Sequence, residues 1–300
     1  MYTSCLVTDE EMRELKQHGS SGYPIQFYVD ELYRFPDQTL PLHWHPEPEL
    51  WVAEGGDVLA QVGSDTFRLK EGCAIFVNTN VLHGFRQAAP DARLQCPNIV
   101  FSPELIAPAA SLIYQDYILP VLTDHRIPCM ILERQRGWQG ELLGHLEHMF
   151  SLFQEDSSPC LEMAVQRTLN QIWQILYLHR EEVPLLSSPE HQHLLQIRTQ
   201  KMLSFIHSSY HLPISLADIA RSAGISKSEA SRCFQACLHT SPVSYLLSFR
   251  IRMARHALST GQGTTEQISA ACGFQSASYF CRMFRRYTGM SPRQYRNQSG

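Results

Sequence analysis

Two histidines, His43 and His45, are separated by a single residue within a stretch that has the composition of a β-strand. Side chains two residues apart in a strand point to the same face, so both imidazoles are expected to face one interior. Glu49 follows, but Pro46 and Pro48 interrupt the strand between them, and the spacing alone leaves the direction of Glu49 open. Imidazole and carboxylate groups bind transition metals, and they also line pockets for polar small molecules. This cluster is therefore a first candidate for binding chemistry.

The elements that must position these side chains are short. From residue 25 to about residue 102, stretches rich in β-forming residues alternate with turn signals spaced roughly ten residues apart. The turns are Gly55-Gly56-Asp57, Gly63-Ser64-Asp65 and Lys70-Glu71-Gly72. Strands of this length and spacing are typical of an antiparallel sandwich or a small barrel.

The order of the polar residues resembles the motif of the cupin barrel, which has a His-x-His pair, a Glu, and later a Gly and a further His. By this resemblance, four side chains converge on one site: His43, His45, Glu49 and His83. In metal-binding cupins such a set holds one ion, and three neutral imidazoles with one carboxylate suit iron, manganese, nickel or zinc. The chain departs from the second cupin motif at Lys70, where a Pro is usual, and at Ile75, where some cupins place a His.

Three interpretations of these four residues stay open. They could bind a divalent transition metal, line a pocket for an organic effector, or be structural side chains with satisfied hydrogen bonds. We expect an effector pocket, because cupin-like sensor domains attached to DNA-binding modules often keep these residues without a metal. No cofactor is otherwise indicated, and a divalent transition metal is the alternative occupant of the barrel.

Residues 103–183 are expected to be helical and amphipathic. Apolar side chains recur every three or four residues in two runs, first Leu142, Leu146, Met149, Phe150 and Phe153, then Leu161, Val165, Leu169, Ile172, Leu176 and Tyr177. Residues 154–159 separate the runs, which predicts a helical hairpin. The stripes could pack on the chain's own core or pair with a second copy, and we favour a dimerisation segment and hence a homodimer. A linker is expected at 184–192, which contains two prolines and two serines.

The last third of the chain contains an internal repeat. The run that begins Gly224-Ile225-Ser226 and ends Ser241-Pro242 recurs as Gly273-Phe274-Gln275 to Ser291-Pro292, about fifty residues later. Each run follows a short helix opened by a capping pair, Ser215 with Asp218 and Thr264 with Gln267. The two glycines supply the positive φ that ends this helix and turns the chain into the next one. Two helix-turn-helix units are therefore predicted.

The charge is divided unevenly along the chain. Residues 193–300 contain 13 Lys and Arg against three acidic residues, a formal charge of +10, whereas residues 1–192 carry −14 and the whole chain −4. A basic module joined to an acidic one is typical of a polyanion-binding domain fused to a domain that does not contact the polyanion. Double-stranded DNA is the partner that this distribution indicates.

The same hundred residues resemble the AraC/XylS family of bacterial transcription regulators. The resemblance rests on both helix-turn-helix copies and includes residues 215–220, 232–234, 245–246, 273–274, 278–280 and 289–292. It implies that two recognition helices, about 227–238 and 277–287, enter successive major-groove segments one helical turn of ~34 Å apart.

Position by position, the resemblance assigns bases and phosphates to different side chains. The residues that would face bases are Ser228, Ser231 and Arg232 in the first helix, and Ala277, Ser278, Cys281 and Arg282 in the second. Those that would contact phosphates are Lys227, Arg250, Arg285, Arg286 and Arg296. Arg can bind guanine through two hydrogen bonds, whereas Ser is less selective.

The sequence thus predicts an α+β protein with a cupin-like antiparallel β-barrel at 1–102, the helical segment at 103–183, the linker at 184–192 and an all-α double helix-turn-helix domain at 193–300. The expected function is that of a ligand-responsive, sequence-specific transcription regulator. Its expected partners are operator DNA and a small-molecule effector, and RNA polymerase is left open as a further partner. The alternatives are a cupin metalloenzyme with an accessory DNA-binding domain and an architectural DNA-binding protein without an effector. No membrane span or signal peptide is recognisable, so a cytoplasmic location is expected.

Overall fold

A computed structural model describes residues 6–9, 12–89, 92–135, 137–154, 160–182, 189–238, 240–259 and 263–299. The chain divides into two compact units, residues 1–194 and 195–300, each with a hydrophobic core of its own. No helix within the described ranges is both long and apolar enough to cross a lipid bilayer.

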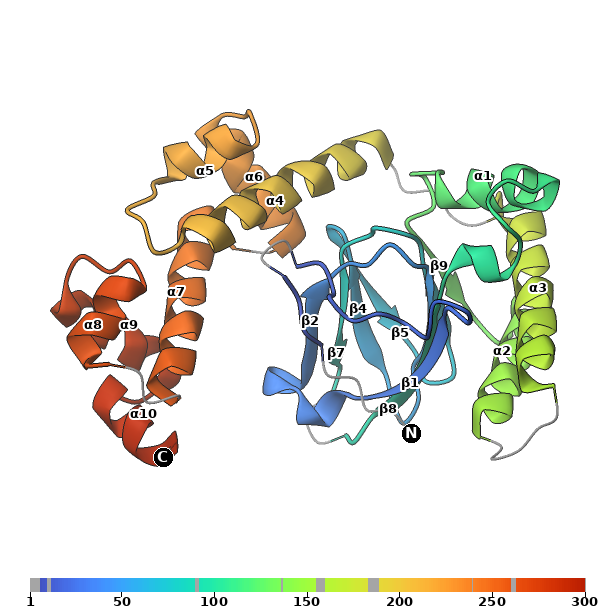
Figure 1. Cartoon of the computed structure of the whole chain (residues 1–300), viewed down its shortest axis with the longest axis horizontal. Coiled ribbons are helices and arrows are strands. Elements are labelled where there is room, and N and C mark those ends of the chain that lie inside the picture. The colour runs from blue at the N-terminus through green and yellow to red at the C-terminus, as the bar shows by residue number, and fades with distance from the viewer. Residues whose placement is uncertain are drawn as a thin grey trace. The chain divides into compact units, whose positions relative to one another are not determined.

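Two antiparallel sheets form the basis of the first unit (Figure 1). The five-stranded sheet has the order β1 (Ile25–Glu31), β8 (Gln95–Phe101), β3 (Glu49–Val52), β6 (Ala74–Val77) and β9 (Cys129–Leu132). The four-stranded sheet has the order β2 (Thr39–His43), β7 (His83–Gln87), β4 (Val58–Val62) and β5 (Asp65–Leu69). The expected α+β class with an antiparallel β domain at its N-terminal side is confirmed.

The five-stranded sheet is buried on both faces. Along its central strands, Trp51 and Ile75 belong to the core shared with the four-stranded sheet, whereas the alternate residues Leu50 and Phe76 belong to a second core on the outer side. Alternate side chains of a strand point to opposite faces, which explains why β6 is apolar throughout and β3 is apolar after Glu49, without polar alternation.

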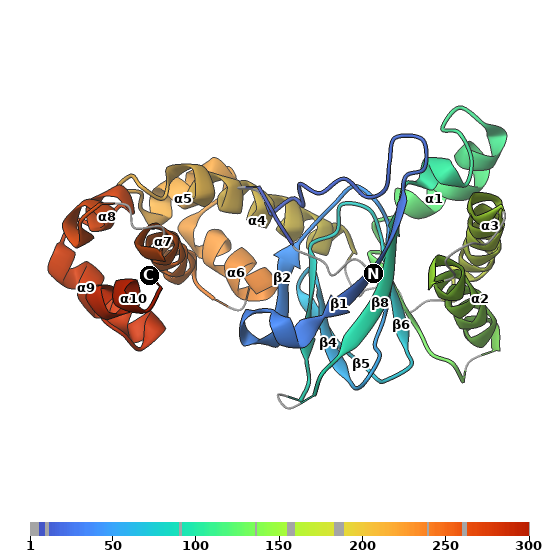
Figure 2. The same ribbon diagram turned by 60° about the horizontal axis from the view of Figure 1, so that its bottom comes forward.

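Two long helices, α2 (Gly137–Gln154) and α3 (Leu161–His179), cover the outer face of the five-stranded sheet, as both views show (Figures 1 and 2). Their apolar stripes, including the fully buried Leu146 and Leu169, share one core with Leu50 and Phe76 of the sheet. The expectation that these stripes pair two chains is therefore wrong, because the chain's own sheet already occupies them. Residues 155–159, between the two helices, lie outside the described residues.

Short helical elements connect the remaining parts of the first unit: η1 (Leu32–Arg34), η2 (Pro36–Gln38), η3 (Pro103–Leu105), η4 (Tyr114–Ile118) and α1 (Leu119–Leu122). Strand β9 also follows residue 102, so the five-stranded sheet extends past the boundary that we expected for the β domain. The β domain and the helical hairpin consequently fold as one unit.

The second unit is entirely helical in its described part, with α4 (Pro189–Ser209), α5 (Leu216–Ser222), α6 (Lys227–Leu238), α7 (Pro242–Ser259), α8 (Thr265–Ala271), α9 (Ala277–Thr288) and α10 (Pro292–Ser299). Both predicted capping boxes are present, at Ser215 before α5 and at Thr264 before α8. Gly224 and Gly273 follow these helices with φ of +68° and +79°, as predicted. Helices α5–α6 and α8–α9 are thus the two helix-turn-helix units.

Helix α4 begins at Pro189, inside the segment that we expected to be a linker. Proline is favoured in the first turn of a helix because its missing N–H needs no partner there, which explains why a proline-containing segment can start a helix. The other expected linker residues, 184–188, lie outside the described residues.

Candidate sensor site and DNA-binding surface

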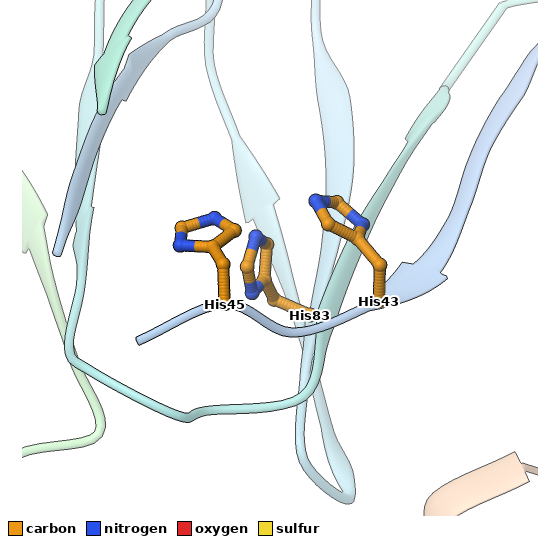
Figure 3. A group of neighbouring side chains, drawn as sticks. All are labelled: His43, His45 and His83. Carbon is orange, nitrogen blue, oxygen red and sulfur yellow. The ribbon is translucent and has the colours of Figure 1, made fainter. Parts of the chain in front are cut away.

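Two neighbouring strands of the four-stranded sheet bring His43 and His83 together. The two residues are directly paired in the β2–β7 register, and their ring centroids are 4.3 Å apart. His45 follows two residues after His43, and its ring lies 5.0 Å from that of His83. Figure 3 shows His43 on β2, His83 on β7 and His45 on the segment after β2, with the three imidazoles on the same side. Ligand nitrogens of all three lie within 4.8 Å of one another, and all three residues are buried.

Glu49 reaches the same space from the opposite sheet. It is the first residue of β3, and the chain crosses from one sheet to the other between His45 and Glu49, where the two prolines stand. Its Oε2 atom lies 3.0 Å from Nε2 of His83 and 3.9 Å from Nε2 of His45. The sequence left the direction of Glu49 open, and the structure brings it to the histidines.

The outer nitrogen of each imidazole is fixed by the backbone. Nδ1 of His43 lies 2.9 Å from the carbonyl oxygen of Pro41, Nδ1 of His45 2.8 Å from that of Glu47, and Nδ1 of His83 2.8 Å from that of Val81. A carbonyl oxygen can only accept a hydrogen bond, so each Nδ1 carries the proton and donates it. Each Nε2 of the neutral ring is then an acceptor.

These acceptors face one another without donors. Nε2 of His45, Nε2 of His83 and Oε2 of Glu49 are buried and lack a hydrogen-bond partner among the described residues. The 3.0 Å approach between Oε2 of Glu49 and Nε2 of His83 brings two lone-pair atoms together when the ring is neutral, and it becomes an ion pair only if His83 is protonated. A buried polar atom without a partner costs about 1–3 kcal/mol, and a cation held between such atoms removes this cost. The four residues thus fit the metal that the cupin resemblance implies.

The structure adds residues that the sequence analysis missed. Glu14 and His18 come from the N-terminal segment, and Oε2 of Glu14 lies 4.0 Å from Nε2 of His43 and 3.6 Å from Nε2 of His18. His18 and Asp30 are buried, with Nδ1 of His18 3.1 Å from the Tyr28 hydroxyl. Neither Glu14 nor His18 belongs to a recognisable motif, and their only signal in the sequence is a spacing of four residues between two potential ligands.

The space enclosed by these side chains is small. The cavity next to Glu14, His18, Asp30, His43 and Glu49 measures about 20 Å³. A cavity of roughly 10–15 Å³ holds one water molecule, whereas pockets for organic ligands measure about 300–1,000 Å³. This cavity has the size of an ion or a water molecule and is smaller than a typical pocket for an organic ligand, and the expected effector pocket at these residues stays a prediction.

The electrostatics of the cavity favour a cation. Burial raises the pKa of Glu14 to about 7, and the nearby carboxylate of Glu49 adds to this effect. Burial, followed by the influence of His45, lowers the pKa of His18 to about 3, and burial also holds the pKa of His43 well below its usual range. Uncharged imidazoles therefore share the site with buried carboxyl groups, an arrangement that a positive ion stabilises.

Helix α6 presents the first set of residues that we expected to contact DNA. Ser228, Arg232 and Lys227 are exposed and Ser231 is half-buried, while Ala230, Cys233, Phe234 and Cys237 are buried on the opposite face as predicted. The guanidinium of Arg232 lies 3.2 Å from the carboxylate of Glu229. A second arginine, Arg198 of α4, lies 3.2 Å from the other oxygen of the same carboxylate. Glu229 therefore joins the expected base reader to α4.

Helix α9 presents the second set. Ser278, Arg282, Arg285 and Arg286 are exposed, and Ala277 and Cys281 are half-buried. The guanidinium carbon of Arg282 lies 5.3 Å from the centroid of the Tyr279 ring. Phe280, Met283 and Phe284 form the buried stripe, but Tyr287, which we expected to complete it, is 46% exposed. Tyr287 lies in the last turn of α9, past the helices that cover Phe284.

Two residues of the expected phosphate set have other surroundings. Arg250 donates from Nε to the carbonyl of Tyr210 (2.8 Å) and from Nη2 to that of Leu212 (2.7 Å), so its guanidinium holds the chain after α4 and is not directed to solvent. Burial lowers the pKa of Arg250, in agreement with this internal position. Arg296 is half-buried, and its Nε and Nη2 are buried without a hydrogen-bond partner among the described residues. Of the expected phosphate set, Lys227, Arg285 and Arg286 are exposed and form no ion pair with another described residue.

Comparisons with known proteins agree with both units. Residues 31–195 match the family model of the AraC-like ligand binding domain, and residues 219–298 match that of a helix-turn-helix domain. An uncharacterized HTH-type transcriptional regulator of Bacillus subtilis, YdeC, is 26% identical over 294 residues, which cover 98% of each chain. The HTH-type transcriptional regulator GbdR of Pseudomonas aeruginosa is 31% identical over 101 residues, or 34% of this chain and 28% of that one.

A solved structure of an AraC-type transcriptional regulator from Chromobacterium violaceum is 31% identical with a TM-score of 0.34, and the match covers 35% of this chain and 94% of that one. YdeC and GbdR are named as transcriptional regulators, and they give no support to the alternative of a cupin metalloenzyme. Because the sensor-domain family model covers more than half of the chain and a helix-turn-helix model covers most of the rest, the chain belongs to the AraC family of ligand-responsive, DNA-binding transcription regulators.

Proposed function

We propose that this regulator reads two successive major-groove segments of an operator with α6 and α9. The observation that carries this proposal is the pair of capped helix-turn-helix units, each of which buries one face of its second helix and exposes a polar face with a central arginine. Arg232 and Arg282 lie at equivalent places on these faces and are the expected base readers. Lys227, Arg285 and Arg286 are the expected phosphate contacts.

The sensor unit binds a divalent transition metal in the site of His43, His45, Glu49 and His83. Support comes from the three buried imidazoles, whose ligand nitrogens lie within 4.8 Å of one another, and from three buried acceptor atoms without a hydrogen-bond partner among the described residues, on His45, His83 and Glu49. Imidazole and carboxylate ligands suit iron, manganese, nickel or zinc. The bound ion supplies a positive charge that links the two sheets, and its binding is the event to which DNA binding responds. Any organic effector would need a different or rearranged site.

The remaining features of the proposal follow from the family. The protein acts in the cytoplasm as a regulator and not as an enzyme, and it functions as a homodimer with RNA polymerase as a further contact. Because the inner stripes of α2 and α3 are core, a dimer through these helices would use outward side chains such as Met163 and Leu178, which are 71% and 62% exposed.

Operator selection tests the DNA part of this proposal. The full chain is incubated with random duplexes, and the recovered sequences are expected to contain two conserved blocks about one helical turn apart. The variant Arg232→Ala should lose preference in one block and Arg282→Ala in the other. Recovery of a single block, or of no preferred sequence, would contradict the proposal.

Elemental analysis tests the metal part. The purified full chain is expected to hold close to one transition-metal ion per chain, and His83→Ala should lose it. His148→Ala is the matched control, because His148 is an exposed residue of α2. Metal-loaded and chelator-treated protein should then differ in operator affinity. A metal content that is the same in wild type, His83→Ala and the control, or that is near zero in all three, would refute the site.

A further inference from the structure

The N-terminal segment is paired with the chain at the point where the histidines stand. The amide of Glu14 donates to the carbonyl of Trp44 at 2.9 Å, and the amide of Trp44 donates to the carbonyl of Met12 at 3.0 Å. Trp44 lies between His43 and His45 in the chain, so this pairing brings Glu14 to the segment that carries both, and Oε2 of Glu14 lies 4.0 Å from Nε2 of His43. The Glu14 side chain is only 8% exposed, which shows that it points into the protein.

The carboxylate of Glu14 has no cationic side chain against it. The described part of the chain provides no Lys or Arg nitrogen within 4.0 Å of this carboxylate, and the ammonium of the neighbouring Lys16 lies 4.0 Å from the centre of the Tyr28 ring. Its nearest partners are Nε2 of His18 at 3.6 Å and Nε2 of His43 at 4.0 Å. Nε2 of His43 is an acceptor, as shown above, so it cannot donate to Glu14 while its ring is neutral. A second buried carboxylate therefore borders the same acceptor cluster as Glu49.

We infer that Glu14 is a further ligand of the ion in the histidine site, and that the bound ion fastens the N-terminal segment to the β domain. This inference rests on the metal site proposed above. Three imidazole nitrogens and two carboxylates offer five donors, one more than the tetrahedral set that zinc prefers in closed sites. Added carboxylate oxygen and a higher donor number suit Mn²⁺ and Fe²⁺ better than Zn²⁺. Glu14 thus selects the class of metal and couples its binding to the order of residues 12–18.

Calorimetric titration of the metal-free full chain with MnCl₂ tests the role of Glu14. Glu14→Gln keeps the size of the side chain and removes its charge, so we expect Mn²⁺ to bind at least tenfold more weakly, while Zn²⁺ affinity changes less. The matched control is Glu141→Gln, because Glu141 is an exposed glutamate of α2. The Mn²⁺ electron paramagnetic resonance spectrum should change in Glu14→Gln and stay as in wild type in Glu141→Gln.

Tryptic cleavage after the exposed Arg13 gives a second readout that does not depend on affinity. Mn²⁺ should slow this cleavage in the wild type and in Glu141→Gln, and it should have little effect in Glu14→Gln measured at a saturating Mn²⁺ concentration. If Glu14→Gln binds Mn²⁺ as tightly as the wild type and is protected equally, the inference fails and the metal site stands. If the wild type itself binds neither Mn²⁺ nor Zn²⁺, the metal site fails and the inference falls with it. Thermal melting of each variant separates loss of metal from loss of fold.

Discussion

Replacement of the two turn glycines by alanine should have very different effects, although the sequence presents Gly224 and Gly273 as equivalent. Both adopt a left-handed backbone, and an alanine at such a position costs about 1–2 kcal/mol. At Gly224 nothing lies within 4 Å of an added Cβ. At Gly273 the Cβ would lie 2.3 Å from the carbonyl oxygen of Tyr210, a distance that no rotamer change can relieve.

The clash at Gly273 also breaks an existing contact. The Tyr210 carbonyl accepts a hydrogen bond from Nε of Arg250 at 2.8 Å, and the added Cβ would lie 3.0 Å from that same nitrogen. A hydrogen bond to a charged group contributes about 1.5–3 kcal/mol, and it is lost when the carbonyl moves aside. The sum is about 2.5–5 kcal/mol for Gly273→Ala against about 1–2 kcal/mol for Gly224→Ala.

Hydrogen exchange measures this difference locally. In Gly273→Ala, the amides of α8 and α9 should lose more protection against exchange than any amide loses in Gly224→Ala. The amides of β3 and β6 should keep their protection, because the two units have separate cores. Gly224→Ala should lower protection only slightly in α5 and α6. Operator binding should fall far more in Gly273→Ala. Equal losses in the two variants would refute the argument that contact with Tyr210 distinguishes the two turns.

Three further predictions concern the DNA surface, the helical hairpin and the charge division. Arg282→Ala should weaken operator binding by about 1–3 kcal/mol and relax sequence preference. Arg286→Ala should weaken binding to operator and scrambled DNA alike, and make the slope of log affinity against log salt concentration shallower by about one unit. Fluorescence anisotropy at several salt concentrations separates the two roles. Leu169→Glu should unfold the sensor unit because Leu169 is fully buried. Met163 is 71% exposed, so Met163→Glu should keep the melting temperature of the wild type. If α3 forms the dimer interface, sedimentation should show that Met163→Glu is a monomer. A fragment of residues 193–300 should bind DNA with a steep salt dependence while residues 1–190 do not, and equal binding by both fragments in a mobility-shift assay would contradict the domain assignment.

The helix-turn-helix units could be predicted in detail because their signals are local. Ser215 and Asp218 are three residues apart and form their capping box within one helical turn, so the sequence contains the whole motif. The same applies to the positive φ of Gly273. Tyr287 was misplaced because periodicity alone does not show where the covering helices end.

The sensor site could be predicted only in part. His43 and His45 share a face by strand geometry, but their pairing with His83 depends on a register between strands that are forty residues apart in the chain. Glu14 and His18 could not be identified from the sequence, because the segment that pairs with Trp44 has no periodic pattern of apolar residues. The stripes of α2 and α3 were correctly read as apolar, but periodicity does not reveal whether the covering surface is the chain's own sheet or a second copy.

The contact between Arg198 and Glu229 affects how this regulator can change its target sequences over evolutionary time. Glu229 holds both Arg198 of α4 and Arg232 of the first recognition helix at 3.2 Å. A substitution at position 198 would leave Glu229 with Arg232 as its one ion-pair partner in the described part of the chain, and it would alter how freely that arginine, the expected base reader, reaches a base. Operator preference can therefore drift in a lineage whose DNA-facing residues are all unchanged, and a comparison of paralogues restricted to α6 and α9 would overlook the cause.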